Sequence, residues 1–111
     1  MTGRQLLVLG SAEPRPESFD DALRIAREHV ERSRAEPGCL AHAVHRDAES
    51  PHRLVFVERW QDRAALAAHV ALPASRAFGR ALTGLCTEPP GMSVWDAEAV
   101  ELAALLGRPP R

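Results

Sequence analysis

The sequence predicts an α+β fold in which one four-stranded antiparallel sheet carries helices on one of its two faces. Short apolar runs and amphipathic stretches follow one another in the order β-α-β-β-α-α-β. The chain has 111 residues, which is enough for one small core and too few for a second domain. Hydrophobic residues make up 45% and charged residues 26%, a globular composition that is too apolar for intrinsic disorder.

The first expected strand is the apolar run over residues 5–12, which is too short for a helix and is closed by the proline-rich residues 13–16. Ser18, followed three residues later by an aspartate, resembles a capping box and predicts a helix over residues 19–35. We expect His29 on the polar flank of this helix, as a solvated surface side chain. The inward positions, which share helical spacing, are Phe19, Ala22, Leu23, Ala26, Val30 and Ser33.

A Pro-Gly pair at residues 37–38 ends this helix and begins a turn. The segments 39–47 and 53–60 then predict two strands, which form a hairpin around a polar turn at residues 48–52.

Asp62 can cap a helix that continues to about residue 72. A proline interrupts this helix, and a second helix is expected over residues 75–85. The last strand is predicted over residues 92–100. We therefore expect one domain over residues 1–100, followed by a C-terminal tail over residues 101–111.

Right-handed connections turn this order of elements into the ferredoxin-like arrangement, with the helices on one face of the sheet. The strand over residues 53–60 nevertheless offers apolar side chains to both faces, because Val55 and Val57 alternate with Leu54 and Phe56. The face without helices needs a cover, and a second copy of the chain is the simplest one. The sequence therefore predicts a homodimer.

Charge and composition exclude several classes of function. The net charge of −1 does not favour binding to nucleic acid or to anionic lipid. No apolar run approaches 18 residues and the N-terminus does not resemble a signal peptide, so we expect a cytoplasmic protein that does not enter membranes. Cys39 and Cys86 lack the spacing of a zinc motif and are expected to be reduced and without a disulfide.

One constellation carries chemical information. Strand alternation places Phe56, Glu58 and Trp60 on one face, so that Glu58 is a carboxylate among apolar neighbours. Helical spacing places His69 on the apolar stripe of the following helix, directed at the same space. A hydrogen bond between Glu58 and His69 would hold the histidine tautomer. This pair is either a catalytic pair or a structural clasp between helix and strand.

Three segments in register carry a resemblance to a known family. The chain resembles the antibiotic biosynthesis monooxygenase family of dimeric α/β barrels over about residues 5–100. The segments are Glu36-Pro-Gly-Cys-Leu40, then Glu58-x-Trp60-x-Asp62-x-x-Ala-Leu66-x-x-His69, then Ser75-x-x-Phe78-x-x-x-Leu82. The resemblance implies a homodimer with a pocket between sheet and helices in each subunit. It often also implies oxidation of small aromatic quinols or anthrones by O₂, without metal or flavin.

The same resemblance assigns pocket or near-pocket positions to Glu58, Trp60, His69 and Phe78. His42 stands where many members of the family have an aromatic residue, typically tyrosine. The sequence contains no Tyr and no Asn, so the side chains used by polyketide-oxidising members have no counterpart. A haem-degrading function is also disfavoured, because that branch uses an asparagine on its first strand.

The leading functional hypothesis is a cofactor-independent monooxygenase that acts on a small aromatic molecule and O₂. His69 with Glu58 is the expected base, while Trp60, Phe56 and Phe78 enclose the aromatic ring and His42 completes the pocket. Two other hypotheses stay open: an isomerase or cyclase on the same scaffold, and a ligand-binding dimer without catalysis.

The remaining candidate residues receive structural interpretations. The sequence lacks His-x-His and i, i+4 histidine pairs, so no metal site is expected. His45 and His52 are expected to be solvated beside the hairpin turn. Arg76 and Arg80 form a charged helix face, and Trp95 belongs to the core or to a subunit interface.

Overall fold

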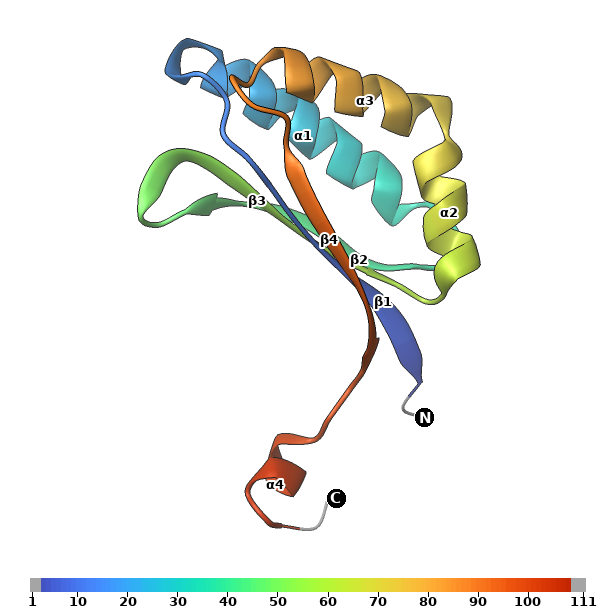
Figure 1. The fold of residues 1–111 in the computed structure, drawn as a ribbon. Coiled ribbons are helices and arrows are strands. Elements are labelled where there is room, and N and C mark those ends of the chain that lie inside the picture. Colours follow the sequence, from blue (N-terminus) through green and yellow to red (C-terminus); the bar gives the residue numbers. More distant parts are fainter. Residues whose placement is uncertain (1–2, 109–111) are drawn as a thin grey trace.

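The computed structural model describes residues 3–108, and their centre is one four-stranded sheet. The strand order is β2-β3-β1-β4, and every neighbouring pair is antiparallel (Figure 1). The strands are β1 (Arg4–Ala12), β2 (Cys39–Asp47), β3 (Ser50–Trp60) and β4 (Gly91–Glu98). This order confirms the predicted ferredoxin-like topology.

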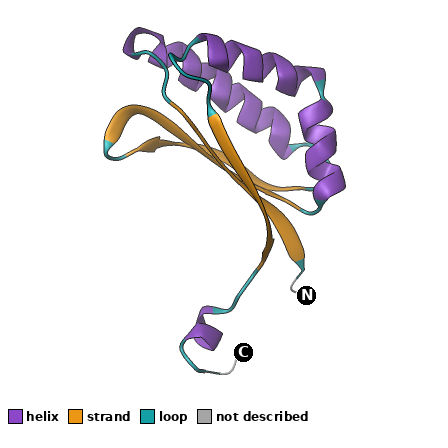
Figure 2. Cartoon of the chain, in the orientation of Figure 1, coloured by secondary structure: helices purple, strands orange, loops and turns teal. Residues whose placement is uncertain are grey.

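A layer of helices covers one face of the sheet, as Figure 2 shows. They are α1 (Phe19–Arg34), which a short 3-10 turn η1 (Pro16–Ser18) precedes, α2 (Arg63–Ala71) and α3 (Pro73–Gly84). The short helix α4 (Leu102–Leu105) follows β4 and lies away from both layers. Within residues 3–108, no helix combines the length and the apolar character needed to cross a bilayer.

Some predicted boundaries were wrong. Strand β3 begins at Ser50 rather than at residue 53, because Ser50 already pairs with Asp47 of β2 and leaves a shorter turn. Helix α3 begins at Pro73 rather than at residue 75, because proline needs no hydrogen-bonded N–H at the first helical position. Ser18 makes no side-chain cap bond and ends the 3-10 turn instead. Asp62 caps α2 as predicted, accepting a hydrogen bond of 2.8 Å from the backbone N–H of Ala65.

The helix-facing side of the sheet holds two groups of buried apolar side chains. One surrounds Phe19, Leu54 and Leu82 beneath α1 and α3. The other joins Val8 and Trp60 near the start of α2. Five polar side chains are also buried in the helix and sheet layers, namely His29, Ser33, His42, Glu58 and His69. Polar side chains are seldom buried without partners, so the contacts of these five residues need an explanation.

The opposite face of the sheet has no helices and carries apolar side chains. Leu7 and Leu9 of β1 lie opposite Trp95 and Ser93 of β4, and the same face continues to Val57 of β3. Trp95 is 48% exposed. It therefore does not belong to the core of the chain, and its role at a subunit interface stays a prediction.

Helices α2 and α3 meet at a single non-helical residue. Leu72 has extended backbone angles, φ −63° and ψ 137°, and Pro73 then starts α3. The residue before a proline is disfavoured in the helical region, which explains the break.

The turn between α1 and β2 depends on Gly38. Its φ of +82° lies in the left-handed region, and a Cβ at this position would lie 2.5 Å from the Cβ of Ala65. Glycine therefore allows α2 to approach the turn that carries Glu36.

We expect Gly38→Ala to lower the free energy of unfolding by about 2–4 kcal/mol, through backbone strain and overpacking together. Chemical denaturation measures this change. The matched control is Gly79→Ala in the middle of α3, where an added Cβ meets nothing within 4 Å. Because alanine favours helix formation, the control should stabilise the chain by up to about 1 kcal/mol. Equal effects of the two substitutions would contradict the assigned role of Gly38.

Candidate active site

A cavity of about 360 Å³ lies between the sheet and the helix layer. Four of the residues predicted from the sequence line it: Phe56 and Glu58 from β3, His69 from α2 and Phe78 from α3. Further apolar walls come from Leu66, Val70, Leu82, Pro89 and Met92. The cavity is therefore apolar, and a carboxylate and imidazoles are among its few polar groups.

Trp60 and His42, which were predicted to bind substrate, are absent from the lining and lie behind Glu58. The indole Nε1–H of Trp60 donates a hydrogen bond of 2.9 Å to Glu58 Oε1. The Nε2 atom of His42 is 3.3 Å from the same oxygen. Both residues therefore contact the Glu58 carboxylate and do not reach the cavity themselves.

His42 is almost completely buried. It is 2% exposed, and within residues 3–108 neither ring nitrogen has a partner in hydrogen-bond geometry. Strand alternation alone would place Leu40 on the same face as His42, but a register shift between Cys39 and Ala41 breaks the alternation. Leu40 is consequently exposed while His42 points inward.

Glu58 is a carboxylate in an enclosed place, being 4% exposed. Burial by itself raises the pKa of Glu58, but His42 and the hydrogen bond from Trp60 outweigh it and lower the pKa below its usual value. Glu58 is therefore ionised and acts as an acceptor at the cavity wall.

The predicted hydrogen bond between Glu58 and His69 was wrong. His69 Nδ1 instead lies 2.8 Å from Oε1 of Glu36, in the turn after α1, and 3.5 Å from the Ser75 hydroxyl. A carboxylate only accepts hydrogen bonds, so Nδ1 is the protonated nitrogen of this contact, and in the neutral ring the lone pair then lies on Nε2. Glu36 was missed because its approach depends on the turn at Gly38 rather than on a strand or helix period.

His29 was predicted to be solvated and is instead 6% exposed in the cavity wall. Its ring stacks on Phe78, with centroids 4.1 Å apart and planes at 7°. The signal was present in the sequence, because residue 29 follows Ala22 and Ala26 at i+7 and i+3 and precedes Ser33 at i+4. The pattern of apolar residues alone did not detect a buried polar member of that stripe.

Three imidazoles meet at this point of the interior. The ring centroid of His29 is 5.3 Å from that of His42 and 5.2 Å from that of His69, and the last two are 5.6 Å apart. Trp60 closes one side, at 4.6 Å from the His69 ring. We call His29, His42 and His69 the histidine cluster. The three residues come from α1, β2 and α2, so no local spacing in the sequence could reveal the histidine cluster.

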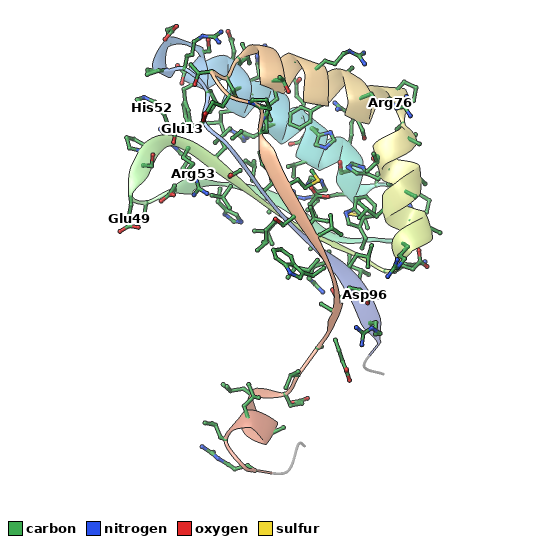
Figure 3. All side chains as sticks on the ribbon, in the orientation of Figure 1. Glu13, Glu49, His52, Arg53, Arg76 and Asp96 are labelled. Atoms are coloured by element: carbon green, nitrogen blue, oxygen red, sulfur yellow. The ribbon has the colours of Figure 1, made fainter. Side chains whose placement is uncertain are left out.

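Other polar candidates lie outside the cluster. Figure 3 shows Glu49, His52 and Arg53 at the β2–β3 hairpin, away from α2. His45 is exposed, as predicted, whereas His52 is half-buried with its ring 5.6 Å from that of Phe19. Arg76, on α3 next to α2, is exposed and borders the cavity, so the helix face that carries it is not separate from the site.

The comparisons with known proteins agree with this architecture. The model of the antibiotic biosynthesis monooxygenase family matches residues 6–81, and the chain belongs to this family. A crystal structure of an antibiotic biosynthesis monooxygenase is 34% identical, with a TM-score of 0.77 over 83% of this chain and 97% of that one. Rv0793 from Mycobacterium tuberculosis is 26% identical, with a TM-score of 0.80 over 88% of this chain and 98% of that one.

A protein of Synechocystis sp., the uncharacterised sll1783, is 26% identical over 90 residues, which is 81% of this chain. The match spans 61% of the length of that relative. A structure from Deinococcus radiodurans has a TM-score of 0.83 at 24% identity, covering 87% of this chain and 97% of that one, and supports the fold alone.

The electrostatics of His29 predict how stability depends on pH. Burial, and then the charges of His42, His69 and Arg32, lower the pKa of His29 from 6.5 to about 3, while Glu58 opposes the shift. The folded chain therefore keeps His29 neutral at pH values where the unfolded chain protonates it. The titration of His29 therefore costs no stability above about pH 6.5. Below this pH the free energy of unfolding falls, and it continues to fall until the pH reaches about 3.

We expect the free energy of unfolding to fall by about 2 kcal/mol between pH 7 and pH 5 because of this residue. Urea titrations in the presence of chelator at several pH values measure the slope. His29→Gln keeps a side chain of similar length without this titration, and should flatten the slope over that range. A slope that is the same in wild type and variant would contradict a neutral, buried His29.

Proposed function

We propose that this chain is a cofactor-independent monooxygenase that oxidises a small quinol-like or anthrone-like aromatic molecule with O₂. Family membership supports the reaction class. The observation that carries the proposal is an imidazole in the wall of an apolar cavity, His69, whose Nδ1 is held by the Glu36 carboxylate at 2.8 Å. A histidine held in this way is oriented for general-base catalysis.

His69 accepts the proton in this mechanism. With Nδ1–H donated to Glu36, Nε2 has the lone pair that can take a proton from a phenolic or benzylic position. Glu36 then faces the imidazolium and stabilises the charge that develops on it. This assigns to Glu36 the orienting role that the sequence suggested for Glu58.

The aromatic side chains of the cavity wall would bind the aromatic ring of the substrate. Phe56 and Phe78 lie with centroids 6.1 Å apart and planes at 71°, so an aromatic molecule can contact one edge and one face. Glu58 is the acceptor available to a substrate hydroxyl at the same wall. Trp60 and His42 are positioning residues in this proposal, because they contact Glu58 rather than the cavity.

The oxidation balances without an added reductant. In an anthrone, removal of a benzylic proton gives an electron-rich anion that reduces O₂ directly. The CH₂ carbon loses both hydrogens and gains a C=O bond, while the second oxygen atom leaves as water. The substrate supplies all four electrons, and the apolar walls keep the anion away from bulk water.

The same base also supports a second reaction class. His69 and Glu36 could transfer a proton between two carbons of a bound molecule, which is isomerase chemistry and needs no oxygen. Uptake of O₂ distinguishes the two classes.

We expect chelator-treated protein to oxidise an anthrone or a naphthoquinol with measurable O₂ uptake. His69→Gln should lower the rate by about 10²-fold or more, because the proton acceptor is lost. The matched control is His45→Gln on the exposed side of β2, which should keep the wild-type rate. An oxygen electrode and product analysis measure both. A wild-type rate in folded His69→Gln would remove His69 from the mechanism.

We also propose that two copies of the chain pack through the helix-free face of the sheet. Leu9, Val57 and Trp95 present an apolar surface there, and no element within residues 3–108 covers it. Exposed apolar area of this kind favours association.

Analytical ultracentrifugation should show a dimer at micromolar concentration, and Trp95→Arg should shift the equilibrium toward the monomer by placing a charge in the apolar contact. The matched control is Leu72→Glu, because Leu72 is also exposed, at 39%, but lies in the helix layer. A wild-type chain that stays monomeric would contradict the proposed dimer. Equal effects of the two substitutions would contradict the assignment of its interface to the helix-free face.

A further inference from the structure

We infer that His29, His42 and His69 form a binding site for one divalent first-row transition-metal ion, of which Zn²⁺ is the natural probe. Each side chain offers one ring nitrogen, and these three atoms lie within 4.8 Å of one another. Three elements, α1, β2 and α2, converge to place them there. Three neutral imidazoles are a ligand set that suits zinc, copper, iron and nickel.

The state of His42 is an independent reason for this inference. Its side chain has no exposed surface, and both ring nitrogens lack a hydrogen-bond partner among residues 3–108. A buried polar group without a partner is costly, and such groups in folded proteins call for an explanation. Coordination of one nitrogen would supply the missing partner, while the other stays near Glu58.

The surroundings of the cluster fit a cation. His69 donates its Nδ1–H to the Glu36 carboxylate, and carboxylate partners of this kind commonly orient metal-binding histidines. Glu58 contributes a second buried carboxylate, 3.3 Å from His42. Two carboxylates beside three neutral rings can balance the charge of a divalent ion.

Metal binding requires a small closure of the cluster. On a tetrahedral zinc ion with Zn–N bonds of about 2.05 Å, three nitrogens lie about 3.3 Å apart. Changes in side-chain rotamers can provide this approach. The guanidinium of Arg32, whose Nη2 is 3.4 Å from His29 Nδ1, must also move, because Nδ1 carries the proton when the other nitrogen binds a metal. Arg32 is exposed and free to leave.

The metal site changes how the proposed function is regulated. The inference goes beyond that function, because the coordinated state and the base use the same lone pair of His69. A filled site therefore removes the free base, while His29, Glu58 and His69 stay in the wall of the cavity.

The experiment titrates chelator-stripped, full-length protein with Zn²⁺ and follows it by calorimetry. We expect one ion per chain with a dissociation constant of about 1 μM or tighter, corresponding to about −8 kcal/mol. Titration with Co²⁺ should give the visible absorption of a four-coordinate ion. His29→Gln, His42→Gln and His69→Gln should each weaken Zn²⁺ binding at least tenfold, and circular dichroism should confirm that each variant is folded.

The matched control is His45→Gln, because His45 lies three residues from His42 on the same strand but is exposed. This variant should bind Zn²⁺ with the wild-type affinity. Three results would overturn the inference: no binding by the wild type, equal weakening in His45→Gln, or unchanged binding in any folded variant of the cluster. Weak binding with several ions per chain would mean an adventitious ion only. All these readouts are independent of activity, so a protein that binds zinc but is inactive in its chelator-stripped form would count against the proposed reaction alone.

Discussion

The burial of one carboxylate, Glu58, constrains the architecture of the site. A charged group with 4% exposure is stable only where donors meet it, and the first donor is the indole of Trp60, two residues along the same strand. That hydrogen bond fixes Trp60, which in turn lies against His69 and edge-on to His42. Trp60 therefore belongs both to the apolar cluster with Leu6 and Val8 and to the surroundings of the histidine cluster, so the two are packed together.

Strand periodicity explains why half of this assembly could be predicted from the sequence. Phe56, Glu58 and Trp60 had to share a face because strand residues alternate, and His69 had to face inward from the apolar stripe of its helix. The partners of these residues could not be predicted in the same way. Glu36 reaches His69 through a turn with a left-handed glycine, and His29 comes from a helix face defined by small residues rather than by large apolar ones. Long-range contacts decide both.

The absence of Tyr and Asn gives the site its particular chemistry. A neutral imidazole has one ring nitrogen that accepts and one that donates, a pair that neither a phenol nor an amide side chain offers. In this chain the buried polar side chains of residues 3–108 are three imidazoles, one carboxylate and the Ser33 hydroxyl, from the four elements α1, β2, β3 and α2. Proton transfer is the use that we propose for His69, and coordination of an ion is the use that we infer for the three imidazoles together.

The interruption at Leu72 changes the direction in which side chains of α3 point relative to those of α2. Residues 69 and 78 are nine positions apart, or about 2.5 turns of an α-helix, so on one continuous helix they would point in opposite directions. The break at Leu72 and Pro73 starts a new helix with a different orientation, and both His69 and Phe78 consequently line the same cavity. The imidazole of His69 and the phenyl ring of Phe78 thus face one cavity from neighbouring helices, which one uninterrupted helix could not have achieved.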